Sequence, residues 1–287
     1  MTANWYVLSV IALLFMGTQR FLYKVSAEKK CNPAWTTFSF MATVTVLSWI
    51  LFFLFDQSVQ NIKFLLFISL LNSSAFVFGT VTHIEALKHI AVSVVYPIIR
   101  LNAVIVVIFS ILFFNDHLSL CQVIGIIMAM AVIAILTRHV DSQKPSYGNT
   151  RRGYILVFIS LLCGSVASIS SKFAAMYTNK IGFMATSYLI GTLFSLGLAK
   201  NLEKREENSN YRDALTIGVV MGLLNFVGFY AFLRALAIGP LSIIVSIAGM
   251  HFVIAVLLSA LIYKEKLAPS RVVGIALTIV AIFLLRL

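Results

Sequence analysis

The sequence predicts an all-α integral membrane protein with ten transmembrane helices, arranged as two inverted repeats of five. Three observations carry this prediction: the composition, the number of long apolar runs, and an internal repeat. Of the 287 residues, 60% are apolar and 11% are charged, whereas a soluble domain carries roughly 45–50% apolar and about 25% charged residues. This composition argues against a soluble enzyme, a nucleic-acid-binding protein or a disordered chain.

The predicted spans follow from the thickness of the bilayer, because a crossing helix needs about 20 mostly apolar residues. The first run lacks a basic start and a small-residue cleavage site, so we expect a membrane helix rather than a signal peptide. The third run is the least apolar, because Asn72, Ser73 and Ser74 lie at its centre. The spans are Trp5–Tyr23, Pro33–Phe55, Phe64–His83, Val92–Phe114, Leu120–Thr137, Tyr154–Phe173, Gly182–Ala199, Ala214–Leu233, Leu241–Tyr263 and Pro269–Leu285.

The second half of the chain repeats the first. Segment 85–136 aligns without a gap with segment 234–285 at an offset of 149 residues, and 15 of the 52 positions are identical. We therefore predict repeats at 1–137 and 153–287, joined by a linker loop at 138–152. Because five crossings are an odd number, the repeats are expected to be inverted, as in transporters that alternate access around a midplane site. A duplicated scaffold without transport is the alternative.

Short motifs in both halves resemble the drug/metabolite transporter superfamily, EamA type. The run 86–93 followed by Pro97 resembles the signature between the third and fourth helices, and it recurs at 234–242. A pattern in the first helix that ends on Lys24 is also similar. The resemblance covers nearly the whole chain and implies a ten-helix carrier that exports or exchanges small metabolites through a central cavity. The chain departs from the family at Ser246, where a proline is expected.

Basic residues inside the predicted spans indicate an electropositive cavity. A buried ionisable residue costs from about 2.5–3.5 kcal/mol upward and therefore faces the bundle interior. Arg100 lies near the middle of the fourth span, Tyr96 shares its helix face, and Pro97 is expected to act as a hinge beside it. Arg20 lies in the first span. We hypothesise that the two guanidinium groups bind an anionic or carboxylate-bearing solute. The alternative is an Arg100–Glu85 brace, with Arg20 reaching the interface.

Other predicted site residues are polar or aromatic and recur at helical spacing in the third, eighth and ninth spans. The expected lining residues, besides those above, are Asn72, Phe76, Thr80, Asn225, Phe229 and Ser246. Small and hydroxyl residues also favour helix packing, which is the alternative for this group. His83, Glu85 and His251 are candidates for coupling transport to protons, because histidine titrates near neutrality. A packing role for the histidines is the other interpretation.

No motif for catalysis, phosphate binding or metal binding competes with transport. We therefore expect no enzymatic activity, cofactor, metal or nucleic-acid partner. The predicted function is secondary transport of a small polar metabolite, anionic or zwitterionic, such as an amino acid or organic phosphate, by alternating access. An exporter or flippase for hydrophobic cations or lipid-linked substrates is the alternative. The expected location is the inner or plasma membrane, with the bilayer and a small-molecule substrate as partners and a monomer or homodimer as the assembly.

The basic residues also predict an orientation. The odd-numbered connections carry 15 Lys and Arg residues and the other side carries 4. Because basic loops stay cytoplasmic, this bias predicts that both termini lie outside, whereas the family resemblance implies that they lie inside.

Overall fold

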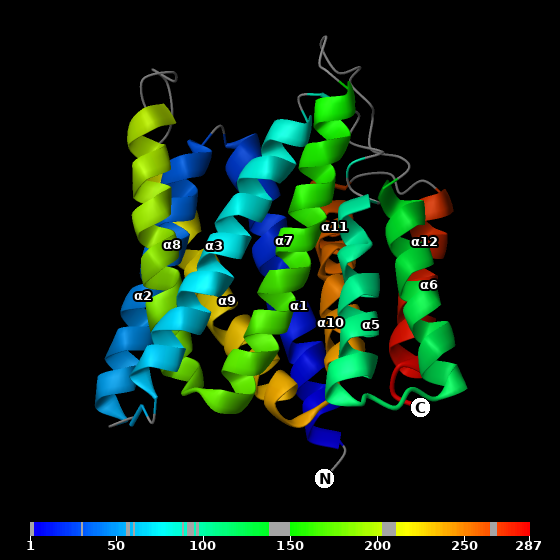
Figure 1. The fold of residues 1–287 in the computed structure, drawn as a ribbon. Helices are drawn as coiled ribbons and strands as arrows, with labels where there is room; N and C mark the ends of the chain where they lie inside the picture. The colour runs from blue at the N-terminus through cyan, green and yellow to red at the C-terminus, as the bar shows by residue number, and fades with distance from the viewer. Residues whose placement is uncertain are drawn as a thin grey trace.

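The structure is a computed structural model in which every regular element of the described residues is a helix. It describes residues 3–29, 31–55, 58–59, 61–87, 89–90, 95, 98–137, 150–202, 211–264 and 269–287. The helices are α1 (Ala3–Glu28), α2 (Pro33–Leu54), α3 (Ile62–Leu87), α5 (Asn102–Phe114), α6 (Leu120–Thr137), α7 (Thr150–Tyr177), α8 (Lys180–Leu202), α9 (Tyr211–Ile238), α10 (Leu241–Gly249), α11 (His251–Tyr263) and α12 (Pro269–Leu284). They run side by side as one bundle (Figure 1).

The predicted spans correspond closely to these helices, with two corrections. The fourth predicted span, Val92–Phe114, is interrupted at Leu101 within its described part, so α5 begins only at Asn102. The ninth is interrupted as well. Within the described residues, six helices are long and apolar enough to cross a membrane: Trp5–Glu28, Pro33–Leu54, Ile62–His83, Thr150–Tyr177, Tyr211–Ile238 and Leu241–Tyr263. The last of these was predicted as one regular helix, but it is interrupted at Met250. The backbone N–H of Met250 donates to Ile247 O and that of Val253 donates to Met250 O, at 3.1 and 2.9 Å. These i→i+3 bonds tighten the helix locally and divide it into α10 and α11.

The surface of the bundle is apolar and much of its interior is polar. Phe67, Leu70 and Phe158 are more than half exposed, whereas Ser48 and Ser69 are completely buried. A soluble protein shows the opposite tendency. This distribution fits helices that present apolar side chains to lipid and keep their hydroxyl groups against one another.

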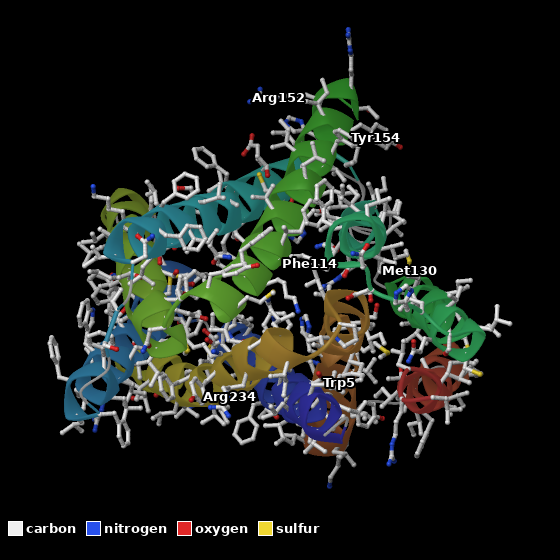
Figure 2. The ribbon with its side chains drawn as sticks, turned by 60° about the horizontal axis from the view of Figure 1, so that its bottom comes forward. Trp5, Phe114, Met130, Arg152, Tyr154 and Arg234 are labelled. Atoms are coloured by element: carbon white, nitrogen blue, oxygen red, sulfur yellow. The ribbon has the colours of Figure 1, made fainter. Side chains whose placement is uncertain are left out.

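The main helix contacts join the two halves of the chain. Helix α3 packs on α7, α1 on α9, α2 on both α8 and α9, and α6 on α12. The α6–α12 pair lies at the edge of the bundle, away from the α3 and α7 helices (Figure 2). The remaining cross-half pairs enclose the centre.

Glycines allow α9 to approach α2 closely. A Cβ atom added to Gly222 would lie 2.5 Å from the Cβ atom of Thr43, and one added to Gly218 would lie 2.6 Å from that of Ser39. Two small residues four positions apart therefore let the backbones meet, as is typical of membrane helix pairs. The Ser39 hydroxyl also donates a 2.8 Å hydrogen bond to Leu215 O across this contact.

A polar cluster joins α7, the turn after α9, the corner after α5 and the start of α10. In Figure 1, α5 ends and α10 begins at the end of the bundle where α1 begins. Lys172 is 6% exposed, and its Nζ atom donates to Leu236 O and Gly239 O at 2.6 and 2.8 Å. The Asp116 carboxylate accepts from the backbone N–H and the hydroxyl of Ser242, at 3.2 and 2.8 Å. Asp116 also accepts from the hydroxyl of Ser110. These contacts join the corner after α5 to the start of α10.

Candidate functional site: a polar cavity between the two halves

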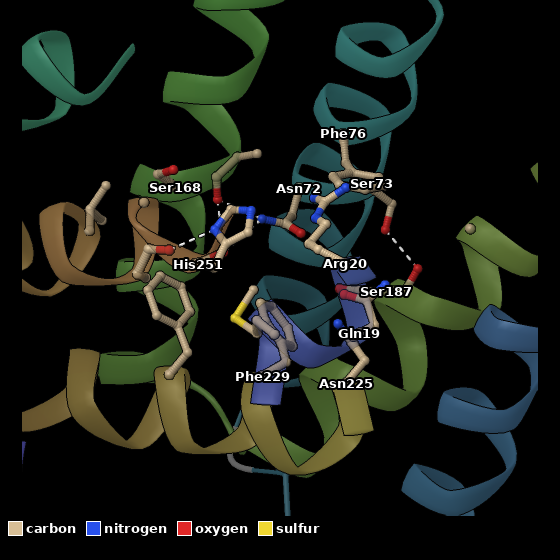
Figure 3. Close-up of a pocket in the computed structure, with 18 of the residues that line it drawn as sticks. Gln19, Arg20, Asn72, Ser73, Phe76, Ser168, Ser187, Asn225, Phe229 and His251 are labelled. Carbon is tan, nitrogen blue, oxygen red and sulfur yellow. Dashed lines mark hydrogen bonds between the residues drawn. The ribbon is translucent and has the colours of Figure 1, made fainter. Parts of the chain in front are cut away.

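A cavity of about 250 Å³ lies inside the bundle and is lined by residues from both halves of the chain. Helix α1 presents Gln19, Arg20 and Tyr23 to it, a spacing that places all three on one helical face. Helix α7 presents Ala167, Ser168 and Ser171 in the same spacing. Gln19 and Arg20 point into the same space as Asn72 of α3 and Asn225 and Phe229 of α9 (Figure 3).

The cavity collects about half of the residues that the sequence singled out. The lining includes Arg20, Asn72, Phe76, Arg100, Asn225, Phe229 and His251. Thr80 and Ser246 do not line it, and their hydroxyl groups donate within their own helices, to Phe76 O and Ser242 O, each at 2.8 Å. Tyr96 and Pro97 lie outside the described residues.

The three candidate coupling residues lie on two helices, His251 on α11 and the other two on α3. His251 lines the cavity at the start of α11, and its Nδ1 atom lies 2.6 Å from Ala248 O. Since a carbonyl only accepts, this contact places the hydrogen on Nδ1. His83 and Glu85 lie near the end of α3 and are not among the lining residues. The Glu85 carboxylate lies 3.7 Å from Nε2 of His89 instead.

The cavity is electropositive. The Arg20 guanidinium lies 5.6 Å from the centre of the Tyr23 ring, and it forms no hydrogen bond or ion pair with any residue in the described part of the chain. The Arg100 guanidinium lies 5.9 Å from the centre of the Phe252 ring. No Asp or Glu of the described ranges lines the cavity. The charged side chains that line the described part of the cavity are therefore cations.

Four side-chain amides give the cavity uncharged polar groups: those of Gln19, Asn72, Asn102 and Asn225. Asn72 Nδ2 donates to Ala167 O at 2.7 Å and to Ser170 and Ser171 hydroxyl groups. The Asn225 Oδ1 atom accepts from the Tyr188 hydroxyl at 2.5 Å, which leaves the Asn225 NH₂ group for another acceptor. Gln19 is 3% exposed, and its amide has no hydrogen-bond partner within the described ranges.

Four aromatic rings form an apolar part of the cavity lining, in contrast to the charged and amide groups. The Phe40 and Tyr188 ring centres are 6.1 Å apart, those of Tyr188 and Phe229 are 5.7 Å apart, and those of Phe229 and Phe232 are 6.0 Å apart. All four rings line the cavity. The site therefore combines cationic, amide and aromatic surfaces.

Sequence reasoning missed Gln19, Tyr23 and Tyr188. The first two lie three or fewer positions from Arg20, so the helical face of an intramembrane arginine was the signal that would have found them. Tyr188 lies in an apolar run with no charged neighbour on its helix face, and only the packing of α8 against α9 brings it to Asn225.

An apolar bundle that encloses a polar cavity is typical of multi-pass membrane transporters. The model of the EamA-like transporter family matches residues 3–138 and 151–287. The chain belongs to this family, within the drug/metabolite transporter superfamily, so the resemblance read from its motifs is confirmed.

Two further comparisons bear on the fold. No curated protein matches the chain. A solved structure described as "Crystal structure of protein" is similar, with a TM-score of 0.77 and 15% sequence identity, and the match covers 98% of this chain and 96% of that one. At this identity the likeness shows a shared fold.

Proposed function

We propose that this membrane transporter is a secondary carrier for a small polar metabolite that bears a negative charge, as a simple anion or as a zwitterion. The observation that carries the proposal is Arg20, a cation that faces the cavity without an ion-pair partner in the described part of the chain. Arg100 lines the same cavity. Guanidinium groups bind carboxylate and phosphate through paired, charge-assisted hydrogen bonds, so an amino acid or an organic phosphate fits this chemistry.

We further propose that the carrier works by alternating access between two inverted repeats. Exchanging the halves turns the α1–α9 contact into the α7–α3 contact, and it maps the α2–α8 and α6–α12 pairs onto themselves. Helix α1 begins at the end of the bundle where α7 ends (Figure 1). Such a two-fold relation supports a rocking motion of one repeat against the other around the cavity.

Local backbone features at related positions support the same relation. Leu101 and Met250 both donate their N–H groups in i→i+3 bonds, to Ile98 O at 3.0 Å and Ile247 O at 3.1 Å. Asn115 and Lys264 both have a left-handed backbone, with φ of 50° and 52°. Each pair is separated by 149 residues, the offset of the sequence repeat.

In this proposal Arg20 and Arg100 hold the anionic group, and Asn72, Asn225 and Phe229 surround the rest of the ligand. His251 is the proposed coupling residue that lies in the cavity. His83 and Glu85, near the end of α3, do not line the cavity, so in this proposal they affect coupling without contacting the ligand.

Transport by the purified full chain in proteoliposomes tests the proposal. The panel contains amino acids, organic phosphates and nucleotide sugars, with hydrophobic cations as the competing class. We expect saturable exchange of at least one anionic or zwitterionic solute. Arg20→Gln should reduce that exchange by about tenfold or more, since a charge-assisted hydrogen bond contributes about 1.5–3 kcal/mol.

The matched control is Arg151→Gln, because Arg151 is exposed in the first turn of α7 and does not line the cavity. Its transport should equal that of the wild type. Exchange of cations alone, or equal rates for Arg20→Gln and Arg151→Gln, would contradict the proposal.

A further inference from the structure

The face that α10 turns toward the cavity is uncharged and small. Val245, Ala248 and Gly249 line the cavity, and their spacing places them on one side of the helix. The face of α1 that lines the cavity carries Gln19 and Arg20. The cavity is therefore polar on its α1 side and apolar on its α10 side.

Gly249 differs from the glycines that pack helices together. A Cβ atom added to Gly249 would have no heavy atom within 4 Å, whereas one added to Gly17 would lie 2.5 Å from Ile254 Cβ. No described glycine has a positive φ, so an ordinary L residue fits the backbone at this position. The missing side chain at Gly249 thus serves neither close packing nor a special backbone conformation, and it leaves open space in the cavity.

The internal repeat relates Gly249 to a charged residue in the first half of the chain. Gly249 lies 149 residues after Arg100, so the two occupy related positions in the two halves, and both line the cavity. One half carries a long cation where the other carries no side chain. The two related positions of the cavity therefore differ in size and charge.

A second, independent feature indicates that the cavity holds a polar ligand. Gln19 is 97% buried, since its exposed fraction is 3%, and its amide lines the cavity without a hydrogen-bond partner in the described part of the chain. The amide can therefore exchange hydrogen bonds with a polar ligand that occupies the cavity.

We propose that the space over Gly249 is a subsite for the uncharged side group of the ligand, and that Gly249 sets the largest side group the carrier accepts. This inference rests on the proposed function. The ligand is then an organic anion, a carboxylate or a phosphate ester, whose charged end meets Arg20 and whose apolar group packs on Val245 and Ala248. The Phe229 and Phe232 rings of α9 also line the cavity.

Binding of paired probes to the purified full chain in detergent tests this subsite. Acetate and 3-phenylpropanoate form the carboxylate pair, and methyl phosphate and phenyl phosphate form the phosphate pair. In at least one pair, the wild type should bind the phenyl member about tenfold more tightly, because the ring buries apolar surface. The pair that shows the preference identifies the charged group.

Gly249→Leu should remove this preference while the affinity for the small member changes by less than about twofold, since the leucine fills the subsite and leaves Arg20 in place. Gly249→Ala and Gly249→Val should lower the preference in steps. The matched control is Gly197→Leu, because Gly197 also has nothing within 4 Å of an added Cβ atom and does not line the cavity.

Three results would overturn the inference: a wild type without the phenyl preference, a preference that Gly249→Leu retains, or equal weakening of both members of a pair. If Gly249→Leu does not fold, the alanine and valine variants decide in the same way. The proposed function is judged separately, because small anions that bind in an Arg20-dependent manner would uphold it even where the Gly249 series fails.

Discussion

Replacement of Lys172 by methionine is expected to destabilise the bundle strongly. Lys172 lies in the predicted sixth span, yet its Nζ atom donates to Leu236 O at 2.6 Å and to Gly239 O at 2.8 Å. These carbonyls belong to the end of α9 and the turn after it, where carbonyl groups have no partner within the helix. The ammonium group also lies 5.4 Å from the centre of the Phe114 ring. Methionine has a similar length but donates no hydrogen bond.

The magnitude follows from these contacts. Each hydrogen bond from a charged donor contributes about 1.5–3 kcal/mol, and the variant leaves both carbonyls buried without a donor. In the wild type, the free energy needed to bury the ammonium group offsets part of the contribution of these hydrogen bonds. We expect a net loss of about 3–5 kcal/mol, which lowers the melting temperature by about 10 °C for a chain of this size.

The assay is thermal unfolding of the full chain in one detergent, with Lys63→Met as the matched control. Lys63 is exposed in the first turn of α3, so its replacement should change the free energy of unfolding by no more than about 0.5 kcal/mol. Equal melting temperatures for the two variants would refute the assignment of Lys172 as the residue that holds the end of α9.

Three further predictions concern packing, backbone and orientation. Gly222→Ala should lower the free energy of unfolding by about 1–3 kcal/mol, because its Cβ would lie 2.5 Å from that of Thr43; Gly197→Ala, with open space, is the control, and similar melting temperatures would contradict the close α2–α9 contact. Lys264→Gly should raise the free energy of unfolding by about 1 kcal/mol, because Lys264 has a left-handed φ of 52° that glycine adopts without strain. A lower melting temperature for this variant would contradict the prediction. A topology reporter fused to the C-terminus should report the outside, as the 15 to 4 bias of basic residues predicts; an inside signal would favour the family resemblance.

The class of protein and most of its helices were predictable from the sequence, for a plain physical reason. A bilayer requires long apolar helices whose backbone groups are satisfied internally. Each span can therefore be recognised from its own apolar stretch of sequence. The family motifs and the repeat offset are also properties of the linear chain. The interruption at Met250 was harder to predict, because the apolar run continues through it and a single glycine, Gly249, does not by itself end a helix.

The site was only partly predictable. Intramembrane charge identified Arg20 and Arg100, because an ionisable group at that depth must face the interior. Hydroxyl residues gave a weaker signal: Thr80 and Ser246 satisfy their hydroxyl groups on their own helices. In an apolar helix both faces tolerate small polar residues, so periodicity alone does not say which face turns inward.

The linear sequence by itself determined that this is a helical membrane transporter of the EamA-like family, and it identified the two arginines as candidates for the site. Only the tertiary structure decided that Gln19 and Asn225 meet around one cavity, and that Gly249 opens space in it. The reason is that burial in a membrane bundle depends on which helices pack together, and contacts such as α1 with α9 join segments far apart in the chain.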